Sequence, residues 1–212
     1  MIIKLEKVIP HALENKLDSN SQIWNQSLTF NQEEIYLIKA ISGSGKSTFI
    51  NALYGIRKDY EGNIFYDDLS IKSLSDDLLS PFRLNNLSIV FQNLRLFEHL
   101  TARENLLLSS PKNSYLTDEL INWSELLKVD SLLDKKVAIL SYGERQRFSI
   151  LRALSKNFQF LFLDEPYSHL DKSNALAAHE LILTVASKNK AGIILTSLGN
   201  EDFIQPSKTL LL

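Results

Sequence analysis

Hydrophobic residues are arranged along the chain in short runs that alternate with segments of helical periodicity. The most apolar run covers residues 158–163, where five of six residues are apolar, and it predicts a strand buried on both faces. An apolar run that begins at Ile35 and another at residues 192–196 predict two more buried strands, and residues 173–188 predict a helix. Strands that alternate with helices in this way predict an α/β fold with a mostly parallel sheet.

The N-terminal part of the chain has a different pattern. Residues 2–9 alternate as in an edge strand, residues 10–22 are polar and rich in turn formers, and residues 23–30 predict a returning strand. We therefore expect an antiparallel β part ahead of the parallel core. Further short strands are expected at residues 61–68, 87–92 and 209–212.

Beyond residue 92 the pattern becomes helical and more polar. Thr101 and Glu104 have the spacing of a capping box, and residues 116–127 carry apolar side chains at helical spacing. We predict a helical lobe over residues 93–155, inserted into a single domain that covers residues 1–212.

Composition excludes several classes of protein. The 212 residues are 44% hydrophobic, carry a net charge of −2 and include no cysteine, so disulfides and thiolate metal sites are absent. The balanced charge disfavours nucleic acid as a partner. No run approaches the roughly 20 apolar residues that span a bilayer, and no secretory leader is expected. A role at a membrane would then require a partner.

A Gly-rich turn lies between the strand that begins at Ile35 and a helical segment. Its small residues let consecutive backbone N–H groups point into one concavity, behind which lies the positive end of the helix. Lys46 can reach the β- and γ-phosphates of a nucleotide, and the Ser47 hydroxyl is placed to ligate Mg²⁺. The pattern predicts a phosphate-binding loop made by Ser42, Gly43, Ser44, Gly45, Lys46, Ser47 and Thr48.

Two carboxylates follow the most apolar strand directly. Ligands of open parallel sheets bind at the carboxyl ends of the strands, so Asp164 could hold Mg²⁺ and Glu165 could deprotonate a water. By itself the pair fits an ordinary acidic turn equally well. Together with a phosphate-binding loop, it predicts a nucleotide hydrolase.

A second helix start lies at Ser141, with Glu144 three residues later as in a capping box. Spacing alone favours a well-capped structural helix. The alternative is that Ser141 and Gly143 are exposed at the N-terminus of the helix and bind a phosphate.

The order of these motifs resembles that of the ATP-binding cassette (ABC) ATPases over nearly the whole chain. The resemblance rests on the phosphate-binding loop, Gln92, and the segments 140–147, 160–166 and 168–171. It implies that Lys46, Ser47 and Thr48 hold phosphates and Mg²⁺. It also implies that Gln92 contacts the metal or water, that Asp164 supports the metal and that Glu165 is the general base. For the dimer, it implies that Asp171 lies on the dimer-facing loop and that Ser141 and Gly143 bind the γ-phosphate of the opposite subunit.

A narrower resemblance comes from residues 89–105 together with residues 143–147. These segments are similar to the compact ATPases of lipoprotein release, macrolide export and the cell-division ABC complex. Some partners of that group transmit force instead of moving a substrate.

Four positions depart from the family pattern. Ser197 stands where the family places a histidine that contacts the γ-phosphate, and a neutral, shorter side chain predicts slower turnover. His11 is the one candidate for the aromatic residue that stacks on adenine. Tyr142 replaces the first signature glycine and is expected to crowd the opposite nucleotide, and Ala40 replaces the first glycine of the phosphate loop.

The leading hypothesis is an ATP-binding and ATP-hydrolysing subunit that dimerises on ATP and drives an integral membrane subunit, peripheral on the cytoplasmic face of the membrane. The alternative is a hydrolysis-poor, ATP-gated module of an ABC complex, suggested by Ser197 and by the missing aromatic residue that would stack on adenine. A third reading, an ABC protein that works on DNA or ribosomes, is disfavoured by the single-cassette length and the lack of a basic patch.

Overall fold

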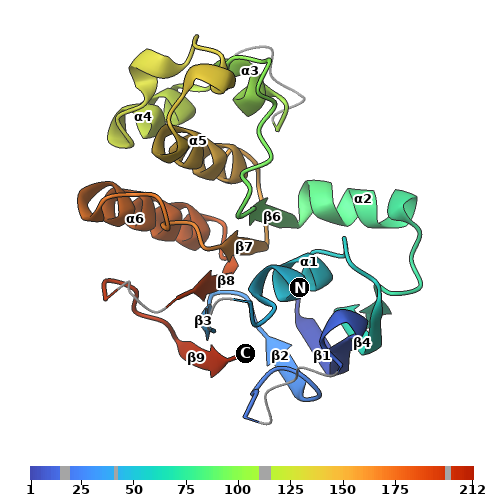
Figure 1. The fold of residues 1–212 in the computed structure, drawn as a ribbon. Coiled ribbons are helices and arrows are strands. Elements are labelled where there is room, and N and C mark those ends of the chain that lie inside the picture. The colour runs from blue at the N-terminus through green and yellow to red at the C-terminus, as the bar shows by residue number, and fades with distance from the viewer. Residues whose placement is uncertain (15–19, 41–42, 110–115, 199–201) are drawn as a thin grey trace.

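The computed structural model describes residues 1–14, 20–40, 43–109, 116–198 and 202–212, which form two sheets and a set of helices (Figure 1). The antiparallel sheet has the strand order β2 (Ser27–Phe30), β1 (Ile3–Pro10), β4 (Tyr60–Tyr66), β5 (Leu69–Ser70). The parallel sheet has the order β6 (Leu87–Val90), β7 (Phe160–Asp164), β8 (Gly192–Ser197), β3 (Ile35–Lys39), β9 (Lys208–Leu211). The predicted α/β fold with a mostly parallel core and an N-terminal antiparallel part is confirmed.

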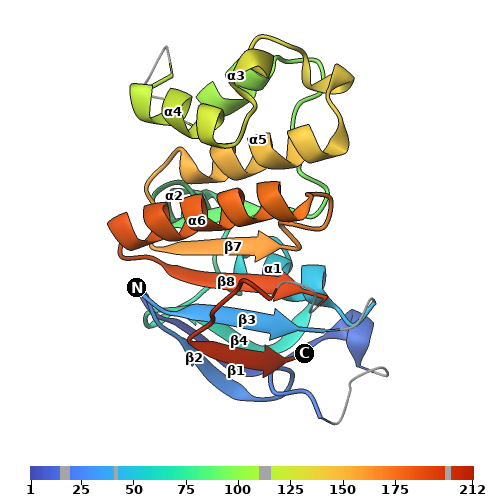
Figure 2. The ribbon, with the colours of Figure 1, turned by 90° about the vertical axis from the view of Figure 1, so that its left-hand side faces the viewer.

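Strand β7 shows why the parallel core forms. All five of its residues are buried, and successive side chains point to opposite faces of the sheet. Phe160 and Phe162 pack with the helix α1 (Lys46–Leu53) and the antiparallel sheet, whereas Leu161 and Leu163 pack with the helices α5 (Tyr142–Leu154) and α6 (Lys172–Lys188). Figure 2 shows these layers, with α5 and α6 on one side of the parallel sheet.

The helices α3 (Ala102–Leu107) and α4 (Asp118–Leu126) lie beyond α5, far from the strands (Figure 1). Both N-termini are capped by side chains: Thr101 forms the predicted capping box with Glu104, and Thr117 accepts a hydrogen bond from the backbone N–H of Leu120. The short 3-10 helices η2 (Asp130–Leu132) and η3 (Val137–Ile139) lead back to α5. The lobe limits of 93–155 and the single domain of 1–212 remain predictions.

Three expectations about the antiparallel part are corrected by the structure. Strand β1 pairs with β2 on one side and β4 on the other, so it is an inner strand and not an edge strand. The strand expected at residues 23–30 shrinks to β2, because Ser21 Oγ accepts hydrogen bonds from two successive backbone N–H groups and makes a turn. Ile23 and Trp24 are buried in that turn, which explains why their apolar pattern resembled a strand. The short strand expected at 61–68 is the seven-residue β4.

One helix was not predicted from the sequence. Helix α2 (Asp76–Asn85) contains Pro81 and leaves Leu78 and Leu84 exposed, so its apolar residues do not form a single buried stripe. Among the described residues, no helix combines the length and the apolar content that a bilayer crossing requires.

Gly62 should be essential for the antiparallel sheet. It has φ +74°, and a Cβ there would lie 2.3 Å from the carbonyl oxygens of Glu6 and Lys7, where the pairing of β1 with β4 shifts register. We expect Gly62→Ala to lower the free energy of unfolding by about 2 kcal/mol or more, because the backbone of β1 must move. Urea unfolding should show this loss, with the exposed neighbour Glu61→Ala as control; equal stability of the two variants would contradict the prediction.

Candidate functional site

The Gly-rich turn that is predicted to bind phosphate lies between the end of β3 and the start of α1. Gly43 and Gly45 both have positive φ, 81° and 103°, and Gly45 caps α1. The backbone N–H groups of the first turn of a helix lack partners within the helix, so this end can bind an anion. Ser44, Lys46, Ser47 and Thr48 are placed as the pattern predicted, whereas Ser42 lies outside the described residues.

Lys46 points into the site and is largely buried. Its Nζ lies 3.2 Å from Glu165 Oε1 and donates a hydrogen bond to the Ala40 carbonyl at 3.2 Å. The two paired side chains are only 6% and 12% exposed, so water screens the ion pair weakly. The structure thus brings together the predicted phosphate-binding lysine and the predicted general base.

Gln92 joins the two sides of the site. Ser47 Oγ donates to Gln92 Oε1 at 3.0 Å, and Gln92 Nε2 donates to Glu165 Oε2 at 3.4 Å. Asp164 completes the set, because its carboxyl lies close enough to the Ser47 hydroxyl for that hydroxyl to lower its pKa. The oxygens of Ser47, Gln92 and Asp164, which were predicted as metal ligands, therefore lie together.

The Asp164 carboxylate is buried at the end of β7. Thr196 Oγ1 donates to Asp164 Oδ1 at 2.8 Å and accepts a hydrogen bond from the backbone N–H of Glu165 at 3.2 Å. Burial raises the pKa of Asp164, and the neighbouring hydroxyls of Ser47 and Thr196 offset only part of this rise. Thr196 was not predicted as a site residue; its signal is a hydroxyl at the end of the strand that pairs with β7.

Glu165 has a backbone conformation that a non-glycine residue rarely adopts, with φ 49°. Gln146, a buried polar residue of α5, holds this turn in place. Its Nε2 donates to the carbonyls of Glu165 at 3.2 Å and Pro166 at 2.6 Å, and its Oε1 accepts from the backbone N–H of His169 at 3.1 Å. Gln146 was also missed, although a glutamine among the apolar residues of α5 is a usable signal.

Ser197 follows Thr196 at the end of β8, is 2% exposed, and pairs in register with Lys39 of β3. His11 lies in the 3-10 helix η1 (His11–Leu13) with an exposed imidazole 3.9 Å from Glu14. The residue of this segment that contacts the phosphate turn is Leu13, whose Cδ1 lies 2.6 Å from the position of a Cβ at Gly45. The roles of Ser197 and His11 stay predictions.

The predicted dimer-facing residues lie at two helix starts. Ser141 caps α5 in a capping box with Glu144 and is exposed. Gly143 packs against the turn after β7, where a Cβ would lie 3.0 Å from the His169 carbonyl oxygen. Asp171 caps α6 by accepting a hydrogen bond from the backbone N–H of Asn174 at 2.9 Å.

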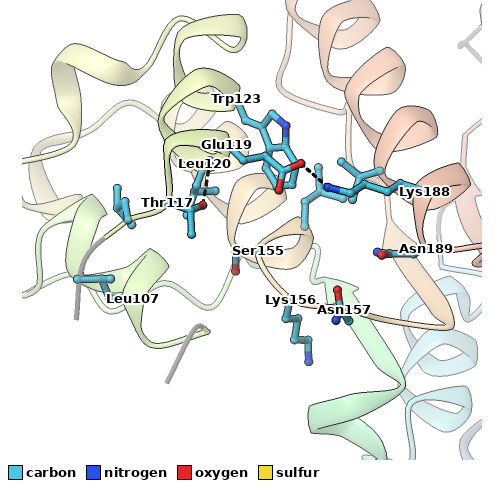
Figure 3. Close-up of a pocket in the computed structure, with 13 residues that line it drawn as sticks. Leu107, Thr117, Glu119, Leu120, Trp123, Ser155, Lys156, Asn157, Lys188 and Asn189 are labelled. Carbon is cyan, nitrogen blue, oxygen red and sulfur yellow. Dashed lines mark hydrogen bonds and ion pairs between the residues drawn. The ribbon is translucent and has the colours of Figure 1, made fainter. Parts of the chain in front are cut away.

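A separate cavity of about 130 Å³ lies between α4, the end of α5 and the C-terminal end of α6 (Figure 3). Leu120 and Trp123 line it. Glu119 and Lys188 also line it and form an ion pair, with Glu119 Oε1 2.7 Å from Lys188 Nζ. Since none of the predicted site residues lines this cavity, it is distinct from the phosphate-binding site.

A parallel sheet whose carboxyl ends carry a Gly-rich turn, a buried lysine and two carboxylates defines a P-loop nucleotide-binding protein. Within this class, residues 23–168 match the family described as ABC transporter. The chain belongs to this family as an ABC transporter ATP-binding subunit.

Curated relatives and a solved structure agree with this assignment. The chain is 34% identical to the lipoprotein-releasing system ATP-binding protein LolD of Buchnera aphidicola, with 81% of this chain and 76% of the relative covered. It is also 34% identical to the molybdenum import ATP-binding protein ModC of Paramagnetospirillum magneticum, of which it spans 48% while 81% of this chain is covered. The dimeric structure of MJ0796, a bacterial ABC transporter cassette, superposes with a TM-score of 0.79 at 25% identity, covering 92% of this chain and 88% of that one.

The ionised carboxylate of Asp164 should lower the free energy of unfolding of the protein when no ligand is bound. Because burial raises its pKa in the folded state, the wild type loses stability as the pH rises from the unfolded value near 3.8 through the folded value. We expect Asp164→Asn, which keeps an acceptor for Thr196, to be more stable than wild type at pH 7. The gain should be about 1.4 kcal/mol for each unit by which the pKa is raised.

Denaturant unfolding of the nucleotide-free proteins between pH 3 and pH 8 measures this difference. The two stabilities should converge near pH 3, where the carboxyl is protonated in both states. A wild type that is more stable than Asp164→Asn at pH 7 would show that the carboxylate is favourably paired, and would contradict the prediction.

Proposed function

We propose that this ABC transporter subunit binds and hydrolyses ATP and that two copies enclose the nucleotide while they drive a membrane-spanning partner. The observation that carries the proposal is the Lys46–Glu165 ion pair at the phosphate-binding turn, with Gln92 bonded to both Ser47 and Glu165. These groups are the parts that phosphoryl transfer to water requires: a cation for the phosphates, a base and polar side chains that orient the water.

The donor set suits Mg²⁺. Ser47, Gln92 and Asp164 present a hydroxyl, an amide and a carboxylate oxygen, and Mg²⁺ prefers oxygen ligands and takes the remaining ones from water and phosphate. When bound, the ion would neutralise charge on the phosphates. Asp164, whose raised pKa reflects an unfavourable buried charge, would gain a favourable partner.

Glu165 would act as the general base. In the structure its carboxylate is paired with Lys46. The phosphates of ATP offer Lys46 a stronger anionic partner, which would release the carboxylate to accept a proton from the attacking water. Gln92 and the backbone clamp by Thr196 and Gln146 would keep the carboxylate near that water.

The second copy would contribute the residues at the other helix starts. Ser141 and Gly143 lie at the N-terminus of α5, where the Ser141 hydroxyl and the N–H groups of the first helical turn would bind the γ-phosphate held by the partner subunit, and Asp171 would lie at the interface. The dimeric MJ0796 cassette supports this arrangement.

A groove beside the turn after β6 is the best surface for the membrane-spanning partner. It has a volume of about 260 Å³, and Phe97 and Leu108, which line it, are 51% and 55% exposed. Similarity to ATP-binding proteins of lipoprotein release and of molybdenum import supports a membrane partner without selecting a substrate. This subunit would be cytoplasmic and peripheral at the membrane.

The Glu165→Gln variant tests the hydrolytic role. We expect turnover of Mg-ATP to fall about a hundredfold or more, because the base is lost while the nucleotide still binds. The variant should then accumulate as an ATP-bound dimer in size-exclusion chromatography. Glu125→Gln, at an exposed position of α4, is the matched control. A wild type that neither binds nor hydrolyses Mg-ATP would refute the function.

Ser197 is the observation that favours the second candidate function, in which the protein is a hydrolysis-poor, ATP-gated module. If the missing histidine limits turnover, Ser197→His should raise kcat about tenfold, since a charged donor stabilises a phosphate better than a hydroxyl does. A cavity of about 170 Å³ adjoins Ser197 and leaves room for the ring. Phosphate release at saturating ATP measures the effect, with Ser197→Ala as control. A folded, ATP-binding Ser197→His protein no faster than wild type would reject this explanation.

A further inference from the structure

Tyr142, the first residue of α5, has a large side chain that turns back onto its own subunit. Its hydroxyl donates a hydrogen bond of 2.8 Å to the backbone carbonyl of Gln92. Its ring lies against the imidazole of His169, with 4.1 Å between the ring centroids and 57° between the planes. The side chain therefore contacts both the turn after β6 and the turn after β7.

The turn after β6 needs such an anchor. Leu94 and Arg95 both have positive φ, 59° and 47°, which non-glycine residues hold only when their surroundings enforce it. Helix α5 supplies these contacts. Arg152 donates to the carbonyl of Leu94 at 2.6 Å and to that of Arg95 at 2.5 Å, and Tyr142 holds the carbonyl of Gln92.

A fixed backbone at Gln92 also fixes the position and direction of its Cα–Cβ bond, and therefore the reach of its side chain. That side chain accepts a hydrogen bond from Ser47 and donates to Glu165 at a long 3.4 Å, so a small backbone movement would break the second contact. The phenol thus acts on the site through Gln92 and not through the nucleotide.

We propose that Tyr142 is a positioning residue for Gln92: its hydroxyl fixes the backbone of Gln92, and this keeps the amide between Ser47 and Glu165. The inference rests on the proposed function, because it assigns Tyr142 a part in the same hydrolysis. It also accounts for a tyrosine at the helix start, since the ring is held against His169 of its own subunit.

Tyr142→Phe removes the hydroxyl and keeps the ring, and Tyr142→Gly removes both. We expect kcat for Mg-ATP to fall about three- to tenfold in both variants, the effect of losing one hydrogen bond. The affinity of each variant for ATP should stay within about twofold of the wild-type affinity. In a Glu165→Gln background, the fraction of ATP-bound dimer should likewise stay within about twofold of that of Glu165→Gln alone. Tyr60→Phe is the matched control, because among the described residues the buried Tyr60 hydroxyl has no hydrogen-bond partner.

Two measurements separate positioning from a general structural effect. Amide hydrogen exchange of the nucleotide-free protein should become faster over residues 91–95 in Tyr142→Phe, and stay unchanged over the second half of α5. In a Gln92→Ala background, Tyr142→Phe should cause no further loss of kcat, as a double-mutant cycle requires when one residue acts through the other.

The inference is overturned if Tyr142→Phe matches wild type in both kcat and exchange. It is also overturned if Tyr142→Gly weakens the ATP-bound dimer while Tyr142→Phe does not, because the ring would then contact the nucleotide of the partner subunit. If the proposed function itself is wrong, the wild type will not hydrolyse ATP. The hydrogen-exchange experiment would still test whether Tyr142 holds the backbone of Gln92.

Discussion

The ion pair between Lys46 and Glu165 is the interaction on which the site depends. Both side chains are nearly buried, so each would be costly without the other. Glu165 pairs with Lys46 from a backbone at positive φ, and two neutral side chains, Thr196 and Gln146, hold that backbone through hydrogen bonds. The proposed general base is therefore held by the cation that is expected to bind the phosphates.

The order of the parallel strands explains why these residues meet. Strands β7, β8 and β3 are neighbours and end at the same edge, so Asp164, Thr196 and the Gly-rich turn lie at three adjacent strand ends. The register sets Asp164 beside Thr196 and Ser197 beside Lys39. A parallel sheet therefore collects at one edge groups that are far apart in the sequence, which is the general reason for ligand sites at this edge.

The sequence was most informative where one local pattern decides the structure. The run at residues 158–163 predicted β7 because a strand buried on both faces must be almost wholly apolar, and the Gly-rich turn predicted the start of α1 because few other sequences allow its backbone. The pattern failed at Ile23 and Trp24, whose burial in a turn depends on Ser21, and at α2, whose leucines are partly exposed. Thr196 and Gln146 were missed because their roles arise from tertiary contacts with the turn after β7.

Helix α5 has a role that its sequence pattern alone does not reveal. Its apolar side chains pack into the core, yet its polar side chains reach the backbone of two separate turns: Tyr142 and Arg152 hold the turn after β6, and Gln146 holds the turn after β7. Those turns carry Gln92 and Glu165, which bond to each other. Because bonds from one rigid helix fix both turns, any displacement of α5 must alter the geometry of Gln92 and Glu165 together. The same helix is capped by Ser141, which is proposed to contact the nucleotide of the second copy. A change at that helix start is thereby linked through these contacts to Glu165 and Gln92 of its own subunit.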